Sequence, residues 1–155
     1  MRKALHFLFS ISLMLLLTQN VTAQNIPPAN WGLEVSVNKV KINDTIELIF
    51  SATLPKGVHI YANEFVCDPI MADIILDKNP SILAEGKPKA IGAHGRMDEV
   101  FGCEIKEWQD KAEFRQKIKI IGTNPAISGI LEYQMCLDDG SCVLHEYKFN
   151  ITIKT

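Results

Sequence analysis

The chain has 155 residues, a length that suits one domain or one domain and a targeting segment. With 47% hydrophobic and 22% charged residues, it is neither a disordered polyelectrolyte nor a collagen-like repeat. Its formal net charge of −2 excludes a basic nucleic-acid-binding protein, because nothing would neutralise a run of phosphates. A domain of this size can bury a sizeable core, so its four cysteines require an explanation other than folding alone.

Residues 1–23 have the three-part layout of a secretory signal peptide. Arg2 and Lys3 precede the apolar stretch from Ala4 to Leu17, and small residues at Val21 and Ala23 offer a cleavage site. The apolar stretch is shorter than the roughly 20 residues that span a bilayer, so we expect cleavage rather than anchoring. Residues 24–155 are then expected to form one mature domain in an exported, periplasmic compartment, where disulfides persist.

Apolar and polar residues alternate along most of the mature chain, which is typical of strands with one buried face. In chain order, the apolar members of these predicted strands are Leu33, Val35 and Val37; Ile46, Leu48, Phe50, Ala52 and Leu54; Val58 to Tyr61; Phe114, Ile118 and Ile120; Leu131, Tyr133 and Met135; and His145, Tyr147, Phe149, Ile151 and Ile153.

Turns are predicted at Asn43-Asp44 and at residues 55–57. The stretch 71–95 is ambiguous: Ile74 to Leu76 suggests a short strand, and the rest suggests a loop. No stretch has a convincing helical period, so the pattern predicts an all-β protein with an antiparallel β-sandwich.

Cys136 and Cys142 flank a strong turn element, Asp138-Asp139-Gly140, between an incoming and an outgoing strand. A hairpin would place the two cysteines opposite each other, at a Cα separation that a disulfide accepts. The bridge would close a very short loop and remove little entropy from the unfolded chain. A disulfide of this kind at an exposed turn is a candidate for redox chemistry.

Other interpretations of the cysteines remain open. In an exported β-domain, a hairpin disulfide is often a structural staple. Zinc binding with His59, His94 or His145 would require paired Cys-x-x-Cys spacings, which the chain lacks, so we expect no metal. The same absence excludes a thioredoxin-type active site in this chain.

Four short segments occur in an order and spacing that point to one family. They are Trp31; Gly57-Val58-His59-Ile60-Tyr61; Asp98-Glu99-Val100-Phe101-Gly102; and Tyr133-Gln134 together with Cys136 and Cys142. From Trp31 to Thr152 the chain resembles a stand-alone version of the N-terminal periplasmic domain of the thiol:disulfide interchange protein DsbD.

The resemblance implies an immunoglobulin-like sandwich whose cysteine pair carries electrons from a membrane-embedded thiol reductase to thioredoxin-like exported proteins. It makes Cys142 the attacking thiol and Cys136 the resolving thiol. It also implies a cap loop over the pair and two aromatic neighbours of the pair on one face of their strand. The cap residues are Asp98, Glu99, Val100 and Phe101, and the neighbours are His59 and Tyr61.

The chain departs from the family at three places. Val143 to Glu146 stand where prolines often follow the second cysteine, and Val100 replaces a bulky aromatic residue of the cap. Cys67 and Cys103 have no counterpart in the family pattern. Because free thiols are uncommon in an oxidising compartment, we expect a second disulfide between Cys67 and Cys103.

The sequence therefore predicts an exported thiol–disulfide exchange protein, a protein-disulfide oxidoreductase component that needs no cofactor. Its expected partners are proteins rather than nucleic acids, and no small-molecule substrate is evident. The alternative is a non-catalytic immunoglobulin-like binding domain whose disulfides are structural.

Overall fold

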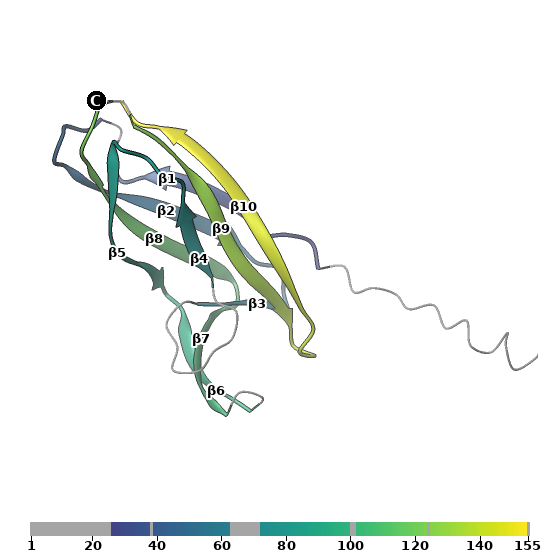
Figure 1. The fold of residues 1–155 in the computed structure, drawn as a ribbon. Coiled ribbons are helices and arrows are strands. Elements are labelled where there is room, and N and C mark those ends of the chain that lie inside the picture. Colours follow the sequence, from purple (N-terminus) through teal and green to yellow (C-terminus); the bar gives the residue numbers. More distant parts are fainter. Residues whose placement is uncertain (1–25, 38, 63–71, 100–101, 124, 155) are drawn as a thin grey trace, which may run out of the picture.

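A computed structural model describes residues 26–37, 39–62, 72–99, 102–123 and 125–154. Within these ranges the protein is all-β, and two antiparallel sheets pack face to face as an immunoglobulin-like sandwich (Figure 1). The predicted signal peptide, residues 1–23, lies outside the described residues. In the part of the chain that the structure covers, no helix has the length and apolar character to cross a membrane.

The sandwich consists of a four-stranded sheet and a six-stranded sheet. The first sheet has the order β1 (Asn30–Val35), β2 (Thr45–Thr53), β8 (Lys111–Ile120) and β5 (Ile82–Ile91). The second has the order β10 (Cys142–Thr152), β9 (Ala126–Leu137), β3 (Val58–Tyr61), β7 (Cys103–Trp108) and β6 (His94–Asp98), and β4 (Asp73–Leu76) also pairs with β9.

Side chains from both sheets meet in one apolar core. Edge-to-face aromatic pairs join the sheets: Trp31 with Tyr133 at 5.3 Å, Phe50 with Phe149 at 4.9 Å, and Trp108 with Phe114 at 5.8 Å between ring centroids. Each such pair contributes about 0.5–1.5 kcal/mol beyond the burial of its area. Two residues that carry the family resemblance, Trp31 and Tyr133, are therefore partners in this core.

The structure confirms the predicted sandwich and both predicted turns. Asn43 and Gly57 occupy these turns with φ of 78° and 76°, a region that asparagine and glycine tolerate best. The first predicted strand is too long, because β1 ends at Val35 and Val37 lies beyond it, 43% exposed.

The predicted loop after Leu76 is wrong for much of its length. Residues 82–91 form the edge strand β5, which pairs with β8, and β6 begins at His94. The register of β5 shifts between Glu85 and Lys89, around Gly86, which has a φ of 70°. A bulge on an edge strand breaks the period-two pattern on which the prediction depends.

Candidate functional site

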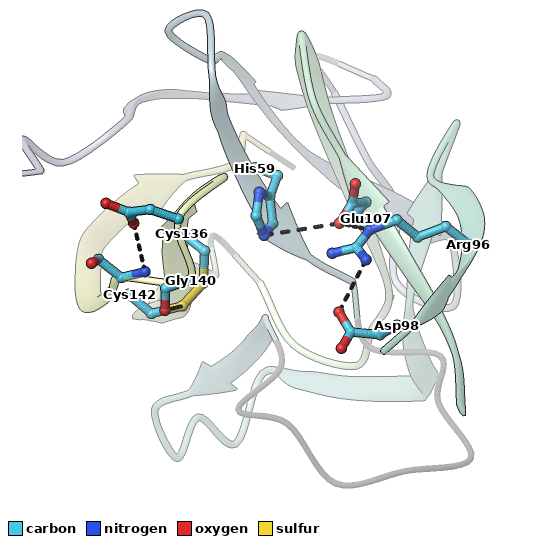
Figure 2. Close-up of a disulfide and its surroundings, with 9 residues drawn as sticks. His59, Arg96, Asp98, Glu107, Cys136, Gly140 and Cys142 are labelled. Atoms are coloured by element: carbon cyan, nitrogen blue, oxygen red, sulfur yellow. Dashed lines mark hydrogen bonds and ion pairs between the residues drawn. A yellow bond between two sulfur atoms is a disulfide. The ribbon is translucent and has the colours of Figure 1, made fainter. Parts of the chain in front are cut away.

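The hairpin of β9 and β10 brings Cys136 and Cys142 together. The two strands pair along their length, and the last register position before the turn joins Cys142 with Cys136. Gly140, with a φ of 86°, allows the sharp reversal of the chain, and the Ser141 amide donates to Asp139 Oδ1 at 2.9 Å. The two cysteines form a disulfide with a Cα–Cα distance of 4.1 Å (Figure 2).

The two cysteines of this disulfide differ in their exposure to solvent. Cys136 is fully buried, at 0% exposure, whereas Cys142 is exposed. The Sγ atom of Cys142 lies 3.6 Å from the carbonyl oxygen of Gly140. A disulfide sulfur carries no proton, so this contact becomes a hydrogen bond only when Cys142 is a thiol. The bond is therefore open to attack at Cys142 and shielded at Cys136.

Cys136 is buried on the outer face of the second sheet, away from the main core. Its neighbour Met135 points into the core, and strand alternation turns Cys136 to the other side. Residues directly opposite each other on paired strands share a face. Four such pairs lie on the same face as Cys136: His59 opposite Cys136, Tyr61 opposite Glu107, Arg96 opposite Ile105, and Asp98 opposite Cys103. We call these eight residues the outer cluster.

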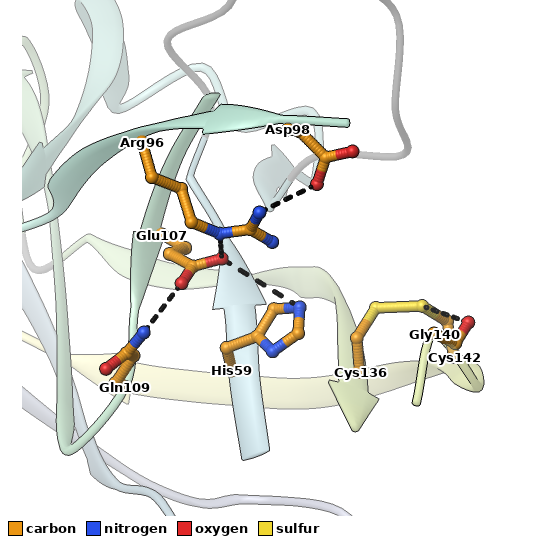
Figure 3. A network of polar contacts seen from close by, with 8 residues as sticks. All are labelled: His59, Arg96, Asp98, Glu107, Gln109, Cys136, Gly140 and Cys142. Atoms are coloured by element: carbon orange, nitrogen blue, oxygen red, sulfur yellow. Dashed lines mark hydrogen bonds and ion pairs between the residues drawn. A yellow bond between two sulfur atoms is a disulfide. The ribbon is translucent and has the colours of Figure 1, made fainter. Parts of the chain in front are cut away.

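A charged network runs through the outer cluster (Figure 3). Arg96 Nε lies 2.8 Å from Glu107 Oε2, and Arg96 Nη1 lies 3.0 Å from Asp98 Oδ2. Gln109 donates from Nε2 to Glu107 Oε1 at 2.8 Å. Asp98 and Glu107 are buried, at 4% and 2% exposure. Because buried carboxylates are costly unless they are paired, Arg96 is the group that makes this arrangement stable.

His59 lies between the disulfide and this network in both close-up views (Figures 2 and 3). Its side chain is buried, and its ring meets Tyr61 edge-on at 5.1 Å. Its Nε2 atom lies 3.9 Å from Glu107 Oε2, too far for a hydrogen bond, and has no hydrogen-bond partner among the described residues.

Burial changes the acidity of both aromatic neighbours of the disulfide. Desolvation lowers the pKa of His59 below its usual 6.5, and the nearby carboxylate of Glu107 opposes this shift. Desolvation raises the pKa of Tyr61, and the charge of Asp98 adds to the effect. His59 is therefore a neutral imidazole near pH 7, and Tyr61 a neutral phenol.

The structure places the other predicted site residues as follows. Asp98 is the last residue of β6 and forms an ion pair with Arg96, and Glu99 is exposed in the turn that follows. Val100 and Phe101 lie outside the described residues, so a cap over the cysteine pair stays a prediction. Cys103 is disulfide-bonded and packs against the group around Cys136. Its predicted partner, Cys67, also lies outside the described residues, and that pairing stays a prediction.

Sequence reasoning misses three residues of the network, namely Arg96, Glu107 and Gln109. Their charged or polar character suggests solvent-facing positions, and only the pairing of β3, β7 and β6 brings Arg96 and Glu107 together on the far side of His59 from the disulfide. In the ranges that the structure describes, no three His, Cys, Asp or Glu side chains are grouped so that they could hold a metal ion.

No family model matches the sequence, and no curated protein matches it. Solved structures do match the fold. The N-terminal domain of DsbD from Neisseria meningitidis, in its reduced form, superposes with a TM-score of 0.51 at 19% identity, over 73% of this chain and 80% of that one.

The N-terminal periplasmic domain of ScsB from Proteus mirabilis superposes with a TM-score of 0.55 at 13% identity. This match covers 78% of the present chain and 45% of the ScsB chain, so the chain spans less than half of that structure. At these identities the likeness concerns the fold. The chain therefore has the immunoglobulin-like fold of a DsbD-type N-terminal domain.

Proposed function

We propose that the domain performs thiol–disulfide exchange with other proteins through Cys136 and Cys142. The observation that carries this proposal is the asymmetry of the disulfide, which joins an exposed cysteine to a fully buried one. A staple needs no such difference between its cysteines. An exchange reaction does, because a partner must reach one sulfur while the other is kept for the second step.

In the direction that reduces a partner, the thiolate of Cys142 attacks one sulfur of the partner's disulfide. That disulfide breaks, its other sulfur leaves as a thiolate, and a mixed disulfide joins Cys142 to the partner. The thiolate of Cys136 then attacks Cys142 Sγ and displaces the partner's remaining sulfur. The partner gains two electrons and two protons, and the Cys136–Cys142 disulfide is restored. A reductant of the domain runs the same steps in reverse.

The proposed partners follow from the resemblance and from the chemistry. The electron donor is a membrane-embedded thiol reductase, and the acceptors are thioredoxin-like exported proteins. Two similarities support a redox role in an exported compartment, although they do not concern the partners themselves: the DsbD domain of the same fold has been solved in its reduced form, and the ScsB domain is periplasmic. Cleavage after Ala23 would deliver the mature domain to the same kind of compartment.

Trapping of the mixed disulfide tests the proposal and the division of roles. In cells that export the protein with Cys67→Ser and Cys103→Ser in place, Cys136→Ser should accumulate as an adduct with a protein that carries a thioredoxin-like Cys-x-x-Cys. No second thiol of the domain remains to release that adduct. Cys142→Ser should trap little, because Cys136 is buried. After acid quenching and alkylation, non-reducing gels and mass spectrometry would show a band that disappears on reduction.

Two results would count against the proposal. Adducts with Cys142→Ser alone would reverse the roles of the two thiols. If neither variant forms an adduct while both are folded and exported, the alternative of a non-catalytic binding domain with a structural hairpin disulfide is favoured.

A further inference from the structure

We propose that His59 accepts the proton of Cys136 when this buried thiol resolves the mixed disulfide, and that Glu107 stabilises the imidazolium that forms. The inference rests on the proposed exchange at Cys136 and Cys142. It adds to that exchange the group that handles the proton of the shielded sulfur.

The buried position of Cys136 creates the need for a base. A thiol must become a thiolate to attack a disulfide, and burial in apolar surroundings disfavours the thiolate. Cys136 is 0% exposed and packs with Tyr61 and Ile105, so solvent does not reach its sulfur. A proton acceptor within the outer cluster would remove this obstacle.

His59 has the position that such an acceptor needs. It is the register partner of Cys136 on the adjacent strand β3. Directly opposite residues of an antiparallel pair have Cβ atoms about 4.5–5.5 Å apart and side chains on the same face. Both close-up views place the imidazole between Cys136 and Glu107 (Figures 2 and 3).

The Nε2 atom of His59 is unengaged in the oxidised domain. It is buried and has no hydrogen-bond partner among the described residues, although it lies 3.9 Å from Glu107 Oε2. Both oxygens of Glu107 are already occupied, Oε2 by Arg96 and Oε1 by Gln109. A buried polar atom without a partner is unusual. A role for His59 Nε2 as proton acceptor during resolution of the mixed disulfide would account for it.

The charges around His59 suit a base that is neutral before the step and charged after it. Burial lowers the pKa of His59, so the ring is unprotonated near pH 7. Glu107 on β7, Asp98 on β6 and Asp138 in the hairpin turn all favour the imidazolium, and Arg96 on β6 opposes it. Tyr61, on the same strand as His59, is a neutral phenol. The carboxylates thus stabilise the charge that appears on proton transfer.

The step balances within the outer cluster and the mixed disulfide. His59 Nε2 takes the proton from Cys136 Sγ, and the resulting thiolate bonds to Cys142 Sγ. The bond between Cys142 and the partner's sulfur breaks, and that sulfur leaves as a thiolate, which takes up the proton that the imidazolium releases. In the reverse direction, the imidazolium protonates Cys136 as it leaves.

The test separates the two steps of exchange with 5,5′-dithiobis(2-nitrobenzoate). In the full mature domain with Cys67→Ser and Cys103→Ser, reduced with dithiothreitol and freed of the reductant, the Cys142 thiolate first attacks the reagent and releases one thionitrobenzoate. Attack by Cys136 then releases the second. His145→Gln is the matched control: its Nε2 atom is also buried without a partner, but its ring packs against Tyr133 on the core side of the hairpin.

At pH 7, His59→Gln is expected to slow the second release at least about 100-fold, the lower end of what a positioned general base typically contributes. The first release stays unchanged, and His145→Gln behaves as the parent does. The deficit should shrink steadily as the pH is raised, because hydroxide then removes the proton of Cys136 without help from an imidazole. His59→Tyr keeps an aromatic ring but has no imidazole, and it should show the same deficit. A deficit shared by both variants would then result from loss of the base rather than from a packing defect in the glutamine variant.

Two results would overturn the role of His59 and leave the exchange proposal intact. These are equal second-release rates in parent and variants at every pH, or a deficit of the same size at every pH, which would indicate a packing effect. A folded parent that releases no second thionitrobenzoate would count against both proposals, because Cys136 would not resolve at all.

Discussion

Near the tip of the β9–β10 hairpin, the second sheet has buried side chains on both of its faces. The side chains on the two faces differ in chemical character. The core face consists of apolar and aromatic side chains that meet the other sheet, such as Trp108 and Tyr133. The outer face carries a buried disulfide sulfur beside His59 and the ion pairs of Arg96. The core depends on shape and burial, whereas the outer cluster depends on charge pairing. The first should therefore govern stability, and the second the chemistry of the cysteine pair.

The largest expected effect is the loss of stability when a core aromatic residue is truncated, which should exceed the loss when the disulfide is removed. Phe50 is fully buried and packs on Phe149, so Phe50→Ala should lower the free energy of unfolding by about 3–5 kcal/mol. The double change Cys136→Ala and Cys142→Ala opens only a short loop and should cost about 2 kcal/mol. Urea unfolding measures both. Loss of the cooperative transition in the cysteine variant would show that the disulfide is the staple that holds this fold.

An intermediate effect is expected for Arg96, which balances two buried carboxylates. Arg96→Gln removes the cation that pairs with both Asp98 and Glu107 and should cost about 1–3 kcal/mol, a figure reduced from that of a fully buried pair because Arg96 is partly exposed.

Arg115→Gln is the matched control for this change. Arg115 also contacts two carboxylates, those of Glu47 and Glu113 in the first sheet, but both remain partly solvated. Its loss should leave the unfolding transition nearly unchanged. Equal losses for Arg96→Gln and Arg115→Gln would contradict the idea that burial makes the outer network necessary.

The smallest effect is a pH dependence that His59 introduces. Its pKa is lower in the folded domain than the usual 6.5, so the unfolded chain binds a proton that the folded chain does not. The stability of the domain should therefore fall as pH drops below about 6.5, until the folded pKa is passed. His59→Gln should lose less stability than the parent between about pH 7.5 and about pH 5.5. Identical pH profiles of the two proteins in urea unfolding would contradict the burial of a neutral His59.

Alternation allows the core to be predicted from the sequence, because each core strand has one apolar face. Phe50, Tyr133 and Phe149 all follow this pattern. The pattern fails for β5, where a bulge and an edge position interrupt it. It also fails to identify β7, because Glu107 is buried among outer-cluster residues while Lys106 on the other face is only partly buried.

The candidate site could be predicted only in part. The turn between Cys136 and Cys142 predicts their bridge, and alternation predicts that His59 and Tyr61 share a face. Arg96 could not be predicted, because alternation identifies neither β6 nor β7 as a strand, and only the register of these two strands places Arg96 beside Asp98 and Glu107. A charged residue in an edge strand usually indicates solvent, and here tertiary pairing overrides that expectation.

The central claim is that Cys136 and Cys142 form a redox pair on a fold that does not depend on their bond. The most direct test equilibrates the mature protein in dithiothreitol buffers of graded potential and then alkylates the free thiols for mass spectrometry. Cys136 and Cys142 should become reduced together at potentials above about −300 mV, the level that characterises structural disulfides, while Cys103 remains bonded and the domain stays folded. If the pair remains bonded until Cys103 is reduced or the domain unfolds, the claim is contradicted.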